Sequence, residues 1–175
     1  MPNPDFIPVA EVVNVIGLRG ELKLYPLLNW FEPLLASEFL VWGDEDEPFL
    51  AERHRQAGSC SAVLVEGIHD RNGAERVVGR MVGFLRSRYP DPDFPRPEGG
   101  LPFRWVGRPV RTVDGEALGE VDEVRRAGAG YLLVIPRDGH ELLIPAVPPI
   151  LAPEDALEGE LVIDPPEGLL DVALD

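Results

Sequence analysis

Apolar residues in this chain occur in short runs that glycine, proline and acidic residues separate. Residues 21–25 alternate polar and apolar positions, which places Leu22 and Leu24 on one face of an extended segment. Residues 9–16 are rich in β-branched side chains, which favour strands. The same criteria predict strands in the first half of the chain at residues 9–16, 21–25, 38–42, 49–56, 62–65 and 81–85.

One short helix is expected within this series of strands. Asp70 is a residue type that caps helix N-termini, and Gly79 suits the position just after a helix end. The residues between them include Ala74 and Val77 as apolar positions of the helix. The first half therefore combines several strands with one helix of about two turns.

The second half of the chain shows the strand pattern again, with turn signals between the strands. Asp114-Gly115 and Asp138-Gly139 are dipeptides typical of tight hairpin turns. Short strands at regular spacing with such turns are typical of a small barrel. The expected strands are residues 108–113, 118–125, 131–135, 141–144 and 160–163. The predicted fold class is all-β, with two small β-barrels.

The boundary between the barrels is expected in a proline-rich stretch, residues 89–102, which holds five prolines in fourteen residues. Each proline fixes its own φ, lacks a backbone donor and disfavours helical geometry in the preceding residue. Such a stretch favours an extended, semi-rigid tether that ends at Gly99-Gly100. The predicted organisation is a barrel at residues 1–88, a linker at 89–102 and a second barrel at 103–175.

The net charge of the chain narrows the classes of molecule that it is expected to bind. The net charge is −15, and it divides into −6 up to Leu85 and −9 from Arg86 onward. No cluster of Lys and Arg stands out along the sequence, which argues against generic binding to nucleic acid or to an anionic membrane. Basic proteins are the natural partners of such a chain.

The protein is expected to be cytoplasmic. The single cysteine, Cys60, cannot form an internal disulfide and suits a reducing compartment. The first residues lack the features of a signal peptide, and prolines interrupt the longest apolar run, residues 142–153. We therefore expect a soluble monomer without a membrane partner.

Catalytic chemistry finds little support in the sequence. The three histidines lie far apart without metal-ligand spacing, so neither a metal site nor a cofactor is expected. Cys60 and His69 form a conceivable nucleophile pair, and an ordinary thiol at a strand start is the competing interpretation. A small cytosolic enzyme that uses this pair remains an alternative function.

Two apolar segments are candidates for partner contact. Phe103, Trp105 and Arg108 are residue types that anchor protein interfaces, although the aromatic pair could instead cover one end of a barrel core. Residues 142–149 predict a strand followed by a stiff apolar loop, whose prolines lose little entropy on binding. Its candidate contact residues are Leu143, Pro145 and Val147.

Five motifs in order resemble the RimM family of ribosome maturation factors. The first two are Ile16-Gly-Leu-Arg-Gly-Glu-Leu-Lys-Leu24, which contributes Arg19 as a further candidate contact, and Glu66-Gly-Ile-His-Asp-Arg-Asn-Gly-Ala-Glu75 with the later Gly79. The other three begin at Asp114, Glu141 and Pro166. The resemblance covers nearly the whole chain. Ile16 stands where the family often has histidine, and Phe103 and Trp105 are the nearest equivalents of a family aromatic pair.

The resemblance implies an N-terminal six-stranded β-barrel akin to those of translation factors, followed by a PRC β-barrel. It implies a non-enzymatic factor for late assembly of the small-subunit head and rRNA processing. The implied main partner is the nineteenth small-subunit ribosomal protein on the immature small subunit, with RNA contact secondary. Since that partner is basic, the implication agrees with the acidic charge of the chain. A PRC-barrel adaptor for another complex is the remaining alternative.

Overall fold

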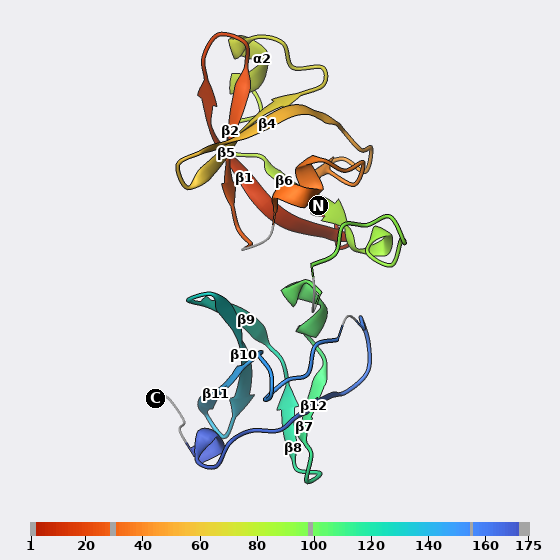
Figure 1. The fold of residues 1–175 in the computed structure, drawn as a ribbon, viewed down its shortest axis with the longest axis vertical. Helices are drawn as coiled ribbons and strands as arrows, with labels where there is room; N and C mark the ends of the chain where they lie inside the picture. The colour runs from red at the N-terminus through yellow and green to blue at the C-terminus, as the bar shows by residue number, and fades with distance from the viewer. Residues whose placement is uncertain (1–2, 29–30, 98–99, 155, 172–175) are drawn as a thin grey trace. The chain divides into compact units, whose positions relative to one another are not determined.

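The computed structural model describes residues 3–28, 31–97, 100–154 and 156–171, which fold into two compact units, residues 1–95 and 96–175 (Figure 1). Strands dominate both units, which confirms the all-β fold class. No helix in the described ranges is long and apolar enough to cross a membrane.

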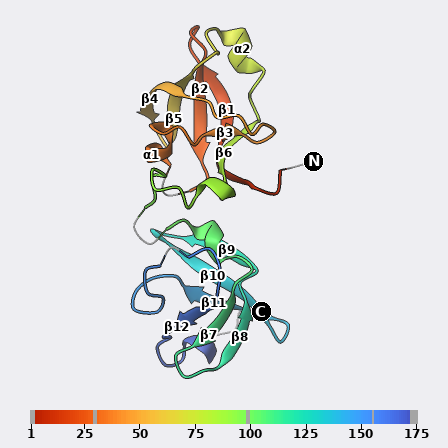
Figure 2. The same ribbon diagram turned by 90° about the vertical axis from the view of Figure 1, so that its right-hand side faces the viewer.

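The first unit is built on one six-stranded antiparallel sheet with the order β3-β6-β1-β2-β5-β4 (Figures 1 and 2). Alternate residues of its central strands are buried, as the sequence pattern predicts; Leu22 and Leu24 are both almost fully buried. The predicted strand at residues 38–42 is reduced to its last two residues. The strands are β1 Phe6–Ile16, β2 Glu21–Pro26, β3 Val41–Trp42, β4 Ala51–Ala57, β5 Cys60–Val65 and β6 Met81–Leu85.

Strand β1 connects the two sides of this sheet because it is long and irregular. It pairs with β6 through its first half and with β2 through its second half. Its register shifts between Pro8 and Ala10 against β6, and between Val12 and Asn14 against β2. Such bulges bend and twist a strand, which lets the sheet curve around a buried face.

The helical segments of the first unit are short, namely α1 Glu32–Leu35, α2 Arg71–Glu75 and the 3-10 turn η1 Arg86–Arg88. Asp70 caps α2 as predicted, and its Oδ1 accepts a hydrogen bond from the Gly73 amide at 2.7 Å. The helix is shorter than the sequence suggests, because its α-helical part ends at Glu75. Gly79 has the expected positive φ of +87°.

An aromatic cluster, formed by Phe84 of β6 and three rings from outside the strands, closes the core of the first unit. Phe94 packs against Phe39 and Phe84 with ring centroids 5.0 and 4.9 Å apart, and Tyr89 lies 5.3 Å from it. Tyr89 and Phe94 are almost fully buried. The first part of the proline-rich stretch therefore belongs to the first unit, and the division after Pro95 lies inside the segment predicted as a free tether. Gly99 of that tether lies outside the described residues.

The second unit consists of two three-stranded sheets, β11-β10-β9 and β12-β7-β8, around one core. Residues 118–125, predicted as one strand, instead form parts of β8 and β9 in different sheets, with buried Val121 between them. The chain forms η2 Pro102–Trp105, β7 Pro109–Thr112, β8 Ala117–Glu120, β9 Glu123–Ala127, β10 Gly130–Arg137, β11 His140–Pro145, β12 Leu161–Ile163 and η3 Leu169–Asp171.

Two sequence motifs of the first unit meet where the β1–β2 turn contacts the start of α2. A Cβ atom on Gly20 would lie 2.4 Å from the Asp70 carbonyl oxygen, and the φ of Gly20 is +76°. Gly17, at the start of the same turn, also has a positive φ, of +70°, but has open space around it. Substitutions at these two glycines therefore distinguish the cost of backbone strain from the cost of a steric clash.

We predict that Gly20→Ala lowers the free energy of unfolding by about 3 kcal/mol or more, because it combines left-handed strain with a backbone clash. Gly17→Ala carries the strain alone and should cost about 1 kcal/mol. Urea denaturation followed by circular dichroism measures both. Equal effects of the two substitutions would show that the contact between the turn and α2 contributes nothing to stability.

Candidate partner-binding surfaces

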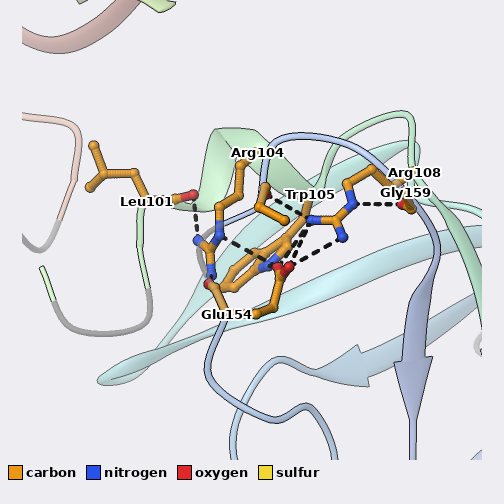
Figure 3. Close-up of polar contacts among 7 residues, drawn as sticks. Leu101, Arg104, Trp105, Arg108, Glu154 and Gly159 are labelled. Atoms are coloured by element: carbon orange, nitrogen blue, oxygen red, sulfur yellow. Dashed lines mark hydrogen bonds and ion pairs between the residues drawn. The ribbon is translucent and has the colours of Figure 1, made fainter. Parts of the chain in front are cut away.

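Two buried arginines share one carboxylate at the end of the second unit where its first residues fold (Figure 3). Arg104 on η2 is 1% exposed and Arg108, just before β7, is 6% exposed. Arg108 Nη1 donates to both Glu154 carboxylate oxygens at 3.0 and 3.2 Å, and Arg104 Nε lies 3.6 Å from Glu154 Oε1. Buried charges require such pairing, because an isolated one would lose its hydration without compensation.

Further contacts fasten the loop that carries Glu154 to η2. Arg108 Nε donates to the Gly159 carbonyl at 2.8 Å, and its Nη1 donates to the Ala156 carbonyl at 2.9 Å. Trp105 Nε1 donates to Glu154 Oε1 at 3.3 Å, while the Arg104 guanidinium lies 4.2 Å from the centre of the Trp105 ring. These charge-assisted bonds fix the loop over one end of the core.

The cluster uses two of the three predicted contact residues in this segment, Trp105 and Arg108. Trp105 is 5% exposed and packs edge-on against Tyr131, so it covers the core, as one of the two interpretations of the sequence has it. Arg108 uses its donors inside the unit. Phe103 is half-buried. Of these three residues, Phe103 retains the most exposed side chain for contact with a partner.

The outer face of the β9–β10–β11 sheet holds two other predicted contact residues. Leu143 lies directly opposite Val134 in the ladder, and Pro145 lies opposite Leu132, so all four side chains share the sheet face opposite to the core. Val134 is only 1% exposed, so this face is covered at its centre. Leu143 and Pro145 are half-buried. Val147, which follows β11, is 40% exposed. The three predicted residues therefore lie along one continuous segment at the surface.

A salt-bridge network crosses the same face. Arg125 on β9 reaches over β10 to Glu141 on β11, with Nη1–Oε2 and Nη2–Oε1 distances of 2.6 and 2.8 Å, and also pairs with Glu123. The hydrogen bonds from Arg125 lower the pKa of Glu141, and the same pairing raises the pKa of Arg125. Because the network holds two carboxylates, of Glu123 and Glu141, and one guanidinium, of Arg125, its net charge is negative.

An acidic hollow of about 530 Å³ lies at the other end of β11. It is bordered by the β7–β8 and β10–β11 turns and by the segment after β12. Its lining includes Arg137, which pairs with Glu116 at 2.9 Å, and His140. The carboxylates that line the hollow outnumber these two basic side chains. They are Asp114, Glu116, Asp138, Asp164, Glu167 and Asp171. No sequence motif singles out these residues as one site, because they come from three separate segments.

The first unit holds the remaining candidates. Arg19 is exposed in the β1–β2 turn, away from the other predicted contacts in sequence and in a different unit. Cys60 is buried at the start of β5, whereas His69 is exposed beyond the end of that strand. Because β5 alone spans roughly 16 Å between its ends, the fold does not form the conceivable nucleophile pair. Among the described residues, no three metal-ligating side chains form a group.

Known proteins of one family match this chain along most of its length. The model of the RimM N-terminal domain matches residues 7–88, and that of the RimM PRC barrel domain matches residues 103–169. The ribosome maturation factor RimM of Syntrophobacter fumaroxidans is 31% identical to this chain over 179 residues. The alignment covers 94% of this chain and 94% of the relative. That of Anaeromyxobacter dehalogenans is 34% identical over 165 residues, covering 94% of this chain and 98% of the relative.

A solved structure also matches the first half of the chain. It is the solution structure of the N-terminal domain of RimM from Thermus thermophilus, with 20% identity and a TM-score of 0.40. The match covers 49% of this chain and 94% of that domain.

The shared carboxylate generates a stability prediction. Glu154→Gln should lower the free energy of unfolding by about 3 kcal/mol, because it leaves two buried guanidinium groups without a counter-charge. Chemical denaturation followed by circular dichroism gives this quantity.

Glu158→Gln is the matched control, since Glu158 is exposed in the same loop. It should change stability by less than about 0.5 kcal/mol. If Glu154→Gln were as mild as this control, Glu154 would not be what holds the loop to η2.

Proposed function

The chain belongs to the RimM family, and we propose that it is a non-enzymatic maturation factor of the small ribosomal subunit that acts by binding a basic ribosomal protein. The relatives bear the name ribosome maturation factor RimM. The proposed partner is the nineteenth small-subunit ribosomal protein in the head of the immature subunit. The proposed consequence is completion of head assembly, which permits the processing of 16S rRNA.

The acidic hollow carries this proposal. Six carboxylates around one concave surface create a local negative potential, which raises the rate of encounter with a positively charged partner. Arg137 offsets only part of that charge, since it pairs with Glu116 and lies 3.9 Å from Asp138. The segments that line the hollow all belong to the second unit, in the part of the chain whose net charge is −9.

The apolar outer face supplies the short-range part of the proposed contact. Electrostatic attraction steers association, but desolvated apolar anchors hold a complex together. Leu143, Pro145 and Val147 are the proposed anchors, with Phe103 at the η2 end of the unit. The buried arginine–glutamate cluster fixes the loop that covers the core and does not itself touch the partner.

We predict that removing two carboxylates of the hollow weakens binding to the nineteenth protein. Asp164→Asn with Glu167→Gln should reduce affinity roughly tenfold in about 0.1 M salt, because exposed charges contribute up to about 1 kcal/mol each. Calorimetric titration of the full chain at two salt concentrations measures the loss, which should shrink at the higher salt.

Asp122→Asn with Glu158→Gln is the matched control, because it removes the same charge from exposed positions of the same unit outside the hollow. An equal loss in the control would mean that only net charge matters. No binding by the unmodified chain would refute the proposed partner.

A further inference from the structure

The arginines of the second unit are largely neutralised by carboxylates, whereas the first unit keeps free cations. Five second-unit arginines contact a carboxylate, namely Arg104, Arg108, Arg111, Arg125 and Arg137. Within the described part of the first unit, no ion pair forms at four cations, namely Arg19, Lys23, Arg53 and Arg76. Although both units are acidic overall, the first therefore has local sites for anions.

Two of these free cations lie on one sheet face together with a third cation. Strand β5 lies between β2 and β4 (Figure 2). Lys23 on β2 and Arg55 on β4 both lie opposite Ala62 of β5, so the three residues form one row. Arg53 lies opposite Leu64, two positions along β5 on the same face. Neighbouring strands are about 4.8 Å apart, so the Lys23 and Arg55 backbones are separated by roughly 10 Å.

Carboxylates offset only part of the charge of this face, since Glu11 of β1 lies directly opposite Tyr25. Glu21, two residues before Lys23, pairs with Arg55 at 2.8 Å. That pair leaves Lys23 and Arg53 on either side of a neutral centre, over Ala62 and Leu64. Three cations, Lys23, Arg53 and Arg55, thus outnumber the two carboxylates, Glu11 and Glu21, on this face of a unit that is acidic overall.

An exposed aromatic residue completes the face. Tyr25 lies two residues beyond Lys23 on β2, therefore on the same side of the sheet, and is 48% exposed. Cations interleaved with an aromatic ring are the pattern with which proteins bind single-stranded nucleic acid, through phosphate contacts and base stacking. A single-stranded RNA segment uses both features, because its phosphates pair with the cations and its bases stack on the ring.

We propose that the β2–β5–β4 face of the first unit binds a single-stranded segment of ribosomal RNA. Lys23 and Arg53 contact phosphates, Arg55 is positioned by Glu21, and Tyr25 stacks on a base. This inference rests on the proposed function, since it assumes that the protein works on a ribosomal subunit. Its acidic surroundings repel RNA at long range, so binding depends on contact within about one Debye length, or about 10 Å at 0.1 M salt.

The test measures binding of the full chain to a fluorescent transcript of the head domain of 16S rRNA in about 0.1 M salt. Lys23→Gln with Arg53→Gln should weaken binding roughly tenfold and flatten the dependence of log affinity on log salt by about 1.5, as expected for two lost phosphate contacts. Tyr25→Leu should weaken binding roughly tenfold with an unchanged salt slope.

Arg76→Gln with Arg126→Gln is the matched control, because it removes two exposed cations from other elements, the C-terminal cap of α2 and β9. It should leave RNA binding within about twofold of the unmodified chain. An equal loss in the control, or no binding by the unmodified chain, would overturn the assignment of this face.

The same variants separate this inference from the proposed function. Lys23→Gln with Arg53→Gln should bind the nineteenth protein as the unmodified chain does. If it loses affinity for immature subunits while its RNA binding is unchanged, the face contacts a protein and the RNA assignment is wrong. Failure of the unmodified chain to bind the nineteenth protein while it still binds the transcript would refute the proposed partner and leave the RNA face standing.

Discussion

Each unit of this chain is too small for its strands alone to close a core, and that constraint determines how the connecting segments fold. A domain of 80 to 95 residues buries a modest fraction of its surface, so segments outside the sheets must cover the open ends. In the first unit, Tyr89 and Phe94 pack against Phe39 and Phe84. In the second unit, η2 and the loop that carries Glu154 do the same through buried ion pairs.

Closing the units in this way leaves their functional surfaces elsewhere. Arg104 and Arg108 use their charges internally, so the second unit presents mainly carboxylates around the hollow at the other end of β11. The first unit forms its sheet so that Lys23, Arg53 and Arg55 share one face. The two units thereby present opposite local charge, which suits a factor that touches both a basic protein and RNA.

Local signals in the sequence were sufficient for much of the fold. Asp70 caps its helix because capping depends only on residues within one turn. Asp138-Gly139 forms the β10–β11 turn with φ values of +52° and +82°, as the dipeptide predicts. The alternation at Leu22 and Leu24 shows which face of β2 is buried.

Other features of the fold and of the candidate surfaces depend on contacts between residues that are distant in sequence. Prolines around Tyr89 and Phe94 favour an extended tether locally, but the aromatic rings bury themselves in the first core. Arginines are rarely buried, and Arg108 is buried because Glu154, 46 residues away, reaches it. The absence of a Lys and Arg cluster along the sequence argued against generic binding to nucleic acid, yet strand register gathers three cations that the sequence separates by up to 32 positions.

The central claim is that the two units address different molecules of the immature small subunit. The most direct measurement places a photoreactive diazirine side chain at Arg53 in one variant and at Pro166 in another, followed by irradiation with bound immature subunits. The account predicts cross-links to 16S rRNA from position 53 and to the nineteenth small-subunit protein from position 166. Cross-links from both positions to one and the same molecule, or the reverse assignment, would contradict it.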